Sequence, residues 1–252
     1  SPASPGWPRR PACGPRTVER VTRPHQDRPQ RLPPDPATPA LAVHGLWKSF
    51  GSKVAVGGGD LAVPRGSFYG LVGPNGAGKT TALSMATGLL VPDAGRVLVH
   101  GADLWADPRA VKGRLGVLPD GMRLFDRLTG TQLVTYAGLL QGLDRATATA
   151  RTTDLMAALD LADDQDTLVV DYSAGMTKKV SLACALVHAP SVLVLDEPFE
   201  AVDPVSAANI RDLLARFVAS GGSGIVSSHV MGLGQRMCSH GGVVPGGGKK
   251  II

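Results

Sequence analysis

The segment Gly73–Thr80 constrains the fold of this chain more than any other feature of its sequence. It reads Gly-Pro-Asn-Gly-Ala-Gly-Lys-Thr and matches the pattern G-x-x-x-x-G-K-[ST]. The apolar run Ser67–Val72 precedes it, and the helix-prone run Thr80–Gly88 follows it. A strand, a glycine-rich loop and a helix in this order form a phosphate-binding loop, because the loop N–H groups and the positive end of the helix point at the same anion. The pattern therefore predicts a parallel α/β fold that binds a phosphorylated ligand.

Side chains of this segment, which we call the phosphate loop, add specific chemistry to the backbone cradle. We expect Lys79 to reach the β- and γ-phosphates of a nucleotide and the Thr80 hydroxyl to ligate Mg²⁺. The alternative, a glycine-rich turn that binds nothing, is disfavoured by the strand before the loop and the helix after it. The predicted nucleotide-binding residues of this segment are Gly73, Pro74, Asn75, Gly76, Ala77, Gly78, Lys79, Thr80 and Thr81.

Strands and helices alternate along the rest of the chain. We expect an edge strand over Leu41–Phe50, and the further expected strands are 54–63, 67–72, 97–99, 115–118, 192–195 and 224–228. Helices are expected after N-caps at Thr129, Asp144 and Asp203, and also over 80–88 and 173–187. The apolar run Val192–Leu195 is typical of a parallel strand that is buried on both faces. This order predicts a parallel α/β core with a helical insertion of about fifty residues.

The positive charge of the chain is concentrated at its beginning. The net charge is +5, and residues 1–38 hold seven Arg and three acidic residues. Residues 1–39 contain eleven of the 20 prolines, so we expect this segment to be disordered. A basic arm that touches RNA or an anionic lipid surface is the alternative. Because the remaining 19 basic and 18 acidic residues nearly cancel, no nucleic-acid partner is expected.

Cysteine usage and hydropathy exclude other classes. The three cysteines, Cys13, Cys184 and Cys238, are too few and too scattered for a disulfide framework or a structural metal site. The sequence contains no apolar run that approaches the roughly 18 residues of a transmembrane helix.

A pair of carboxylates follows the predicted buried strand. Asp196 comes directly after Leu195, and Glu197 is next to it. The carboxyl ends of parallel strands form the crevice in which α/β sheets bind ligands. There Asp196 can hold Mg²⁺ and Glu197 can polarise an attacking water, which together suit phosphoanhydride hydrolysis. An acidic pair that merely closes a strand is the alternative.

Three further segments complete a known set of motifs: Tyr172–Met176 at a helix start, Glu200–Asp203, and Ser227–His229 at a strand end. Together with the phosphate loop they make the chain, from about Ala40 to Cys238, resemble the nucleotide-binding subunits of ATP-binding cassette (ABC) transporters of the bacterial drug- and peptide-export type. The resemblance implies a P-loop NTPase core with a mostly parallel sheet, an N-terminal antiparallel β portion and an inserted helical subdomain at about 121–185. It leaves 239–252 as a Gly-rich tail, which a cut or altered chain end would explain.

The resemblance also implies roles for single residues. Phe50 matches the aromatic residue that stacks on adenine, although a core role is equally compatible with its ring. Ser173 and Gly175 match the signature in which a hydroxyl and an N–H bind the γ-phosphate held by the opposite subunit, although Ser173 can also cap its helix. Asp203 matches the loop that couples the two sites of a dimer, and His229 the histidine that contacts the γ-phosphate.

The chain departs from the family pattern at a few positions. In the signature segment, Tyr172–Met176, Ala174 replaces a glycine and Met176 a glutamine, which we interpret as a property of the export subtype. Asp120 stands where the family has Gln or, in some exporters, Glu. We expect Asp120 to contact Mg²⁺ and the attacking water, but its side chain is one methylene shorter than that of Gln or Glu. A plain Asp-Gly turn at 120–121 is the alternative.

The sequence predicts an ATP-binding and ATP-hydrolysing subunit that powers export. By the resemblance, it works as a homodimer or with a paralogous cassette, beside a separate transmembrane permease subunit, and is peripheral at the cytoplasmic face of the cell membrane. The expected ligands are ATP and Mg²⁺; the catalytic residues are Lys79, Asp120, Glu197 and His229, and the metal ligands are Thr80, Asp120 and Asp196. The alternatives are a non-hydrolysing regulatory cassette and a soluble ABC ATPase that acts on nucleic acid or ribosomes. A GTPase is disfavoured because the sequence lacks an Asn-Lys-x-Asp motif, and a small-molecule kinase would leave the signature segment unexplained.

Overall fold

The structure is a computed structural model that describes residues 38–229 and 240–243. The expected disorder of residues 1–39 falls almost entirely outside this part of the chain, so it stays a prediction. The expected domain boundaries also stay predictions.

The first sheet is antiparallel, with the strand order β2-β1-β4-β5. Its strands are β1 (Leu41–Phe50), β2 (Lys53–Val63), β4 (Ala94–Val99) and β5 (Ala102–Asp103). The expectation of an edge strand over Leu41–Phe50 is wrong, because β1 pairs with β2 on one side and with β4 on the other. Its local sequence could not reveal this, because β4 follows β1 only after the phosphate loop and its helix.

The second sheet is parallel, with the strand order β6-β7-β8-β3-β9. Its strands are β3 (Phe68–Val72), β6 (Leu115–Leu118), β7 (Val192–Leu195), β8 (Ser223–Ser228) and β9 (His240–Val243). All residues of β7 are buried between β6 and β8, as its apolar run predicts. The two sheets confirm the predicted α/β fold with a mostly parallel sheet and an N-terminal antiparallel portion. Strand β9, which pairs with β3, lies within the segment that we expected to be only a tail.

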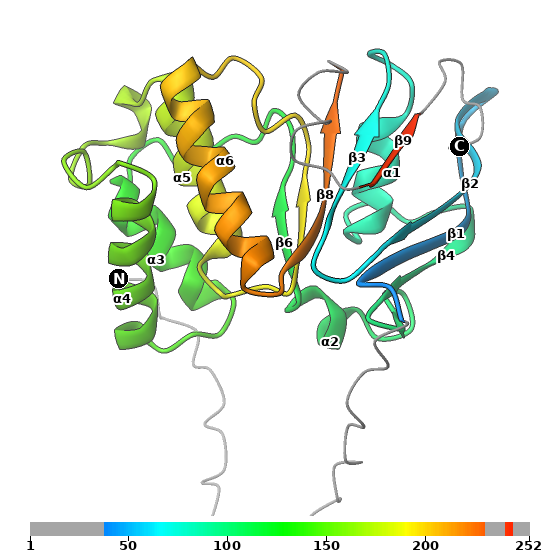
Figure 1. Ribbon diagram of the computed structural model, residues 1–252, viewed down its shortest axis with the longest axis horizontal. Coiled ribbons are helices and arrows are strands. Elements are labelled where there is room, and N and C mark those ends of the chain that lie inside the picture. Colours follow the sequence, from blue (N-terminus) through cyan, green and yellow to red (C-terminus); the bar gives the residue numbers. More distant parts are fainter. Residues whose placement is uncertain (1–37, 230–239, 244–252) are drawn as a thin grey trace, which may run out of the picture. The chain divides into compact units, whose positions relative to one another are not determined.

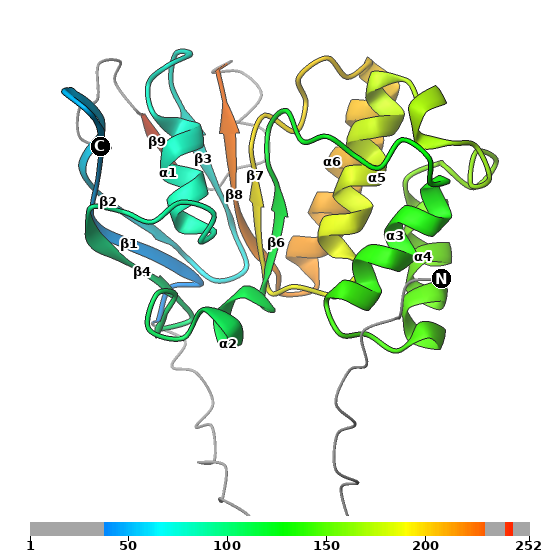
Figure 2. The same ribbon diagram turned by 180° about the vertical axis from the view of Figure 1, so that it is seen from behind.

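Helices flank the parallel sheet and extend away from it (Figures 1 and 2). Helix α5 contacts β6 and also α3, α4 and α6, so it links the helical part of the chain to the sheet. The expected insertion at 121–185 encloses α3, α4 and most of α5. The helices are α1 (Lys79–Ala86), α2 (Pro108–Lys112), α3 (Gly130–Leu140), α4 (Arg145–Ala158), α5 (Ala174–Leu186) and α6 (Pro204–Ala219), with a 3₁₀ turn at Val169–Asp171.

The predicted helix caps are confirmed. Thr129 and Gln132 form a complete capping box at α3. Asp144 accepts a hydrogen bond from the Thr147 N–H at the start of α4. Asp203 caps α6, with a proline at the first helical position. Among residues 38–229, the structure contains no helix that is long and apolar enough to cross a membrane.

The topology brings four loops together. Strands β3, β6, β7 and β8 run parallel, so their carboxyl ends lie at one edge of the sheet. The chain leaves these strands at Gly73, Pro119, Asp196 and His229. The phosphate loop, Asp120, the carboxylate pair and His229 therefore meet at this edge, where α/β sheets bind ligands.

Candidate functional site

A pocket of about 420 Å³ lies at the carboxyl edge of the parallel sheet. Most of the phosphate loop lines this pocket. The other lining residues come from distant parts of the chain, and Phe50 and His229 are 179 positions apart. The lining residues are Phe50, Lys53, Ala55, Asn75, Gly76, Ala77, Gly78, Lys79, Thr80, Thr81, Asp120, Glu197, Glu200 and His229.

The backbone of the phosphate loop has the form that a phosphate cradle requires. Gly78 has a φ of 100°, and a Cβ atom there would collide with the carbonyl oxygen of Ala55, so only glycine fits. No side chain caps the N-terminus of α1, which leaves its first N–H groups without the partner that a capping residue would supply. These donors and the positive end of the helix suit an anion.

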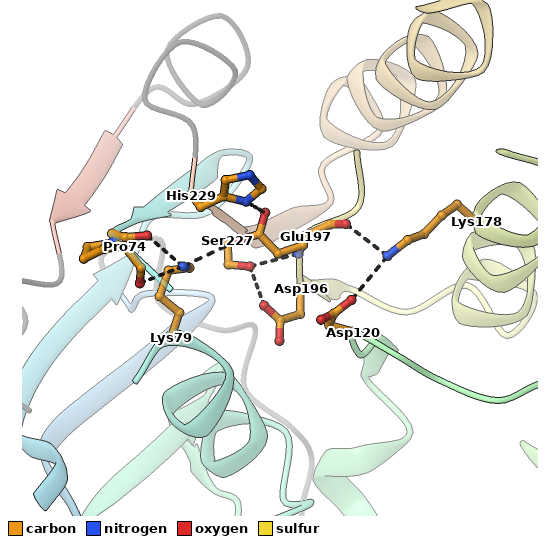
Figure 3. A network of polar contacts seen from close by, with 9 residues as sticks. Pro74, Lys79, Asp120, Lys178, Asp196, Glu197, Ser227 and His229 are labelled. Atoms are coloured by element: carbon orange, nitrogen blue, oxygen red, sulfur yellow. Dashed lines mark hydrogen bonds and ion pairs between the residues drawn. The ribbon is translucent and has the colours of Figure 1, made fainter. Parts of the chain in front are cut away.

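The Lys79 ammonium is held at the mouth of this loop. Lys79 is 5% exposed, and its Nζ donates hydrogen bonds to the carbonyl oxygens of Gly73 at 2.7 Å and Pro74 at 3.3 Å. The same Nζ lies 3.5 Å from Glu197 Oε1 (Figure 3). A buried cation between the loop and a carboxylate is placed to bind phosphate oxygens.

Ser227 links the two carboxylate residues to each other. Its hydroxyl donates a hydrogen bond to Asp196 Oδ1, and the Glu197 N–H donates to its oxygen at 2.9 Å. Asp196 is 3% exposed and Ser227 is fully buried. The end of β8 therefore fixes both residues that follow β7.

Glu197 has an unusual backbone and an incompletely bonded side chain. Its φ of 47° lies in the left-handed region, which costs free energy for a residue with a side chain. Its Oε2 lies at hydrogen-bond distance, 3.0 Å, from His229 Nδ1. Its Oε1 is buried and accepts no hydrogen bond from the described residues; the contact with Lys79 at 3.5 Å is an ion pair only. An orphaned buried oxygen beside a phosphate cradle fits a site that binds a further polar group.

Asp120 lies at the wall of the pocket. Its side chain is 43% exposed, and its Oδ1 lies 3.7 Å from Lys178 Nζ (Figure 3). Asp120 therefore lines the site, although its side chain is shorter than that of Gln or Glu.

The available oxygen donors fit Mg²⁺. Thr80 and Asp120 line the pocket, and Asp196, which does not line it, accepts a hydrogen bond from Ser227 through Oδ1. Hydroxyl and carboxylate oxygens are the donors that Mg²⁺ prefers, and it commonly keeps several waters and substrate oxygens as further ligands. Within residues 38–229 and 240–243, no group of three or more His, Cys, Asp or Glu side chains is placed to hold a metal ion by itself.

Phe50 lies at the other side of the pocket. It is 53% exposed, although its ring could have been buried in the core. The Lys48 ammonium lies 5.7 Å from the centre of the ring. An exposed aromatic ring beside a phosphate cradle offers a stacking surface for a base.

The residues of the signature segment form a separate group with Asp203, which we call the α5–α6 cluster. It consists of Ser173, Gly175 and Asp203, none of which lines the pocket. Ser173 Oγ accepts a hydrogen bond from the Met176 N–H at 3.2 Å. A Cβ atom at Gly175 would come within 2.8 Å of Asp203 Oδ2. The predicted site residues therefore fall into two groups, and the structure does not bring them into one pocket.

Hydrogen bonds also set the ionisation of Asp203. Backbone and side-chain hydrogen bonds from Ser206, followed by the Val205 N–H, hold the pKa of the Asp203 carboxyl below its usual value. Asp203 is therefore a carboxylate at neutral pH, as its capping role requires.

Some residues at the site were not predicted from the sequence. Lys53, Ala55 and Glu200 line the pocket, and Ser227 bridges the carboxylates. Lys178 was also missed, because one lysine on a helix is usually a solvent-exposed residue. Ser227 stands in a segment that we had singled out, and its place two residues before His229 was the available signal.

An apolar groove lies next to the Asp120 loop. It is lined by residues 124–128, Gln132 and Tyr136 and has a volume of about 740 Å³. Phe125 is 61% exposed, and the centre of its ring lies 6.0 Å from the centre of the Tyr136 ring, in an edge-to-face arrangement.

Comparisons with known proteins show which family this chain resembles. The family model described as "ABC transporter" matches residues 57–200. The daunorubicin resistance ATP-binding protein DrrA3 of Streptomyces coeruleorubidus is 40% identical over 185 residues, which are 73% of this chain and 58% of that protein. The Nod factor export ATP-binding protein I of Ralstonia nicotianae is 35% identical over 220 residues, which are 86% of this chain and 68% of that protein. The chain spans only 56% to 58% of the length of two daunorubicin resistance proteins of Streptomyces that it resembles.

Solved structures share the fold. One described as an ATP binding subunit of an ABC transporter superimposes with a TM-score of 0.77 at 25% identity, covering 84% of this chain and 88% of that one. A dimeric bacterial ABC transporter cassette has the same TM-score of 0.77 at 19% identity, covering 84% and 96%. At that identity the second likeness concerns the fold alone.

Proposed function

The chain belongs to the ABC transporter family, and on this premise we propose that it binds and hydrolyses ATP to power export through a separate transmembrane subunit. The observation that carries the proposal is the contact of Lys79 and His229 with the carboxylate of Glu197, at 3.5 Å and 3.0 Å. A cation for phosphate, a carboxylate for water and a histidine beside it are the groups that phosphoanhydride hydrolysis needs.

In this proposal the pocket binds ATP by its phosphates. The phosphate loop and Lys79 hold the β- and γ-phosphates, and the exposed ring of Phe50 stacks on adenine. Thr80, Asp196 and Asp120 are the residues that would hold Mg²⁺, which neutralises charge on the phosphate oxygens when it is bound.

Glu197 is the catalytic carboxylate. It accepts a proton from the water whose oxygen forms a bond to the γ-phosphorus, while the bond from that phosphorus to the β–γ bridging oxygen breaks and ADP leaves. His229 orients this carboxylate through Oε2 and is placed to contact the γ-phosphate. Glu197 Oε1, which accepts no hydrogen bond from the described residues, is available to the water.

The α5–α6 cluster requires a second copy. Ser173 and Gly175 lie outside the pocket of their own chain, so we propose that they bind the γ-phosphate in the pocket of a sister chain or a paralogous cassette. Two chains then close on two ATP molecules, and hydrolysis opens them because the shared phosphate is released. A membrane subunit can use this opening and closing.

The membrane partner and the location follow from the same proposal. The apolar groove, with the exposed Phe125 and Tyr136, offers a transmembrane subunit an attachment surface next to Asp120. The chain would then be peripheral at the cytoplasmic face of the membrane. Drug resistance and Nod factor export are named in relatives, and we extend only export, not a cargo, to this chain. Co-purification of a transmembrane subunit with the full chain would support this part, and a chain that stays free of membranes in the cell would contradict it.

The Glu197→Gln variant tests the core of the proposal. An amide keeps the shape of the side chain but cannot accept a proton, so ATP should still bind while phosphate release falls by about 100-fold or more. With MgATP, light scattering should show a stable dimer for this variant. Lys79→Ala is the control, because it should neither bind ATP nor dimerise.

Two results would contradict the proposal. Phosphate release at the parent rate in Glu197→Gln would show that another group activates the water. A parent chain that binds ATP but releases no phosphate, even with its transmembrane subunit, would point to the non-hydrolysing alternative.

A further inference from the structure

The ammonium of Lys178 joins two loops of the site. Lys178 lies in α5, and its Nζ donates a hydrogen bond to the carbonyl oxygen of Glu197 at 3.0 Å. The same Nζ lies 3.7 Å from Asp120 Oδ1 (Figure 3). The Lys178 side chain is 19% exposed and that of Asp120 is 43% exposed, so Lys178 is mostly shielded from solvent while its ion-pair partner remains open to it.

Glu197 is a residue whose backbone needs such support. A φ of 47° is rarely adopted by residues other than glycine and asparagine, and surrounding contacts must hold it there. Its N–H is bonded to Ser227 Oγ. Its carbonyl oxygen accepts hydrogen bonds from the Glu200 N–H at 3.2 Å and from Lys178. A rotation of this peptide would swing the carboxylate away from His229 and Lys79.

The neighbouring lysine in α5 shows a different arrangement. Lys179 is 4% exposed, and its Nζ lies 3.9 Å from Asp160 Oδ2, on a residue outside the pocket. Lys178, one residue earlier, instead reaches the turn that carries the carboxylate. The two lysines of one helix thus contact different parts of the molecule.

We infer that Lys178 is a positioning residue for Glu197, and that Asp120 holds its ammonium in place. This inference rests on the proposed function, because it concerns the carboxylate to which that function assigns catalysis. It also accounts for a carboxylate at position 120, since a neutral glutamine could not form an ion pair with Lys178. Lys178 acts through Glu197 and does not touch the substrate.

Kinetics of the full chain test the inference. In Lys178→Met, kcat should fall about 10- to 100-fold, as expected for the loss of a hydrogen bond from a charged group. KM and the affinity for MgATP should stay within about twofold, because the phosphate loop is untouched. Lys178→Arg should recover part of the activity, because it keeps the positive charge and a donor.

Lys112→Met is the matched control. Lys112 Nζ also donates a single hydrogen bond to a distant carbonyl oxygen, that of Gly88 at 3.0 Å, but outside the pocket. This variant should keep the parent kcat.

Hydrogen exchange gives a readout that does not depend on ATP turnover. In Lys178→Met, a peptide covering 196–201 should exchange faster than in the parent. Without Lys178 the backbone of Glu197 is held less firmly, so the hydrogen bonds of the Glu197 and Glu200 N–H groups open more often. The Lys112→Met variant should leave this peptide unchanged.

The outcomes separate this inference from the proposed function. Unchanged exchange at 196–201 in Lys178→Met, or a parent-like kcat, overturns the inference. Loss of MgATP binding in that variant overturns it as well, because Lys178 would then shape the pocket rather than position Glu197. Failure of the proposed function shows instead in the parent chain, as absent phosphate release, and the exchange measurement still decides the role of Lys178.

Discussion

The phosphate pocket and the α5–α6 cluster differ in how far the chain itself satisfies their polar groups. In the pocket, Glu197 Oε1 accepts no hydrogen bond from the described residues, and no side chain caps the helix that follows the phosphate loop. In the cluster, Ser173 and Asp203 each cap a helix of their own chain. We therefore expect a ligand to complete the pocket, whereas the cluster is already ordered. Such a preformed surface binds a partner with little loss of conformational entropy.

The largest effect that would test this comparison is expected from Ser173→Ala. If the hydroxyl binds a phosphate in a sister chain, the variant should lose MgATP-dependent dimerisation and at least about tenfold of the ATPase rate, since hydrogen bonds to charged groups are strong. If Ser173 only caps α5, the variant should lose stability alone, by about 1 kcal/mol.

Thr129→Ala is the matched control for this prediction. Thr129 caps α3 in the same way, by accepting a hydrogen bond from the N–H three residues later at 3.2 Å. It should lose a similar amount of stability in urea unfolding and keep the ATPase rate. Equal ATPase losses in the two variants would remove the distinction between pocket and cluster.

The sequence predicts features that depend on neighbouring residues better than features that depend on distant ones. Helix caps such as Thr129 with Gln132, and the buried strand β7, depend on residues close together in the chain, and both predictions are confirmed. The phosphate loop is equally local, and most of its residues line the pocket. Signals of this kind carried most of the fold and the core of the site.

Features that depend on distant partners were missed. The flanking of β1 on both sides and the pairing of β9 with β3 arise from strands that are far apart in sequence. Ser227 belongs to the site because β8 lies beside β7, and Lys178 because its side chain reaches from α5 to the turn that follows β7. Local composition does not encode that convergence. Lys178 could therefore not be distinguished from an ordinary surface lysine, and the signal for Ser227 was only its place two residues before His229.

A smaller effect is expected from Ser227→Ala, which tests the organisation of the pocket. The variant loses the link between the Asp196 carboxylate and the Glu197 N–H. We expect kcat to fall about tenfold at unchanged ATP affinity, because the two hydrogen bonds of Ser227 Oγ, each worth about 1 kcal/mol, no longer hold Asp196 and Glu197.

Ser223→Ala provides the control on the same strand. Ser223 is also buried, and its Oγ accepts a hydrogen bond from the Gly66 N–H at 2.8 Å, away from the pocket. Both variants should lose similar stability, but only Ser227→Ala should lose kcat. A parent-like kcat in Ser227→Ala would show that the pocket does not depend on this bridge.

The smallest expected effect concerns His188, which lies in neither region. Its Nε2 hydrogen-bonds the Leu115 carbonyl at 3.0 Å, and its Nδ1 is buried without a partner among the described residues. Burial lowers the pKa of His188, with Arg151 adding to the effect and the carbonyl opposing it. The neutral ring is thus the form that the fold stabilises.

The sign of the pH dependence follows from this lowered pKa. The unfolded chain binds a proton near pH 6.5, whereas folded His188 resists it, so the stability gained from neutral His188 is complete above about pH 6.5 and is lost as the pH falls through the folded pKa. His188→Gln keeps a donor for Leu115 but cannot titrate. Its urea midpoint should therefore decrease less than that of the parent between about pH 7.5 and 5.5, while MgATP affinity at pH 7.5 stays equal in both chains. An equal decrease in the two chains would mean that protonation of His188 does not affect folding stability. A changed MgATP affinity would mean that the contact of His188 with Leu115 influences the pocket.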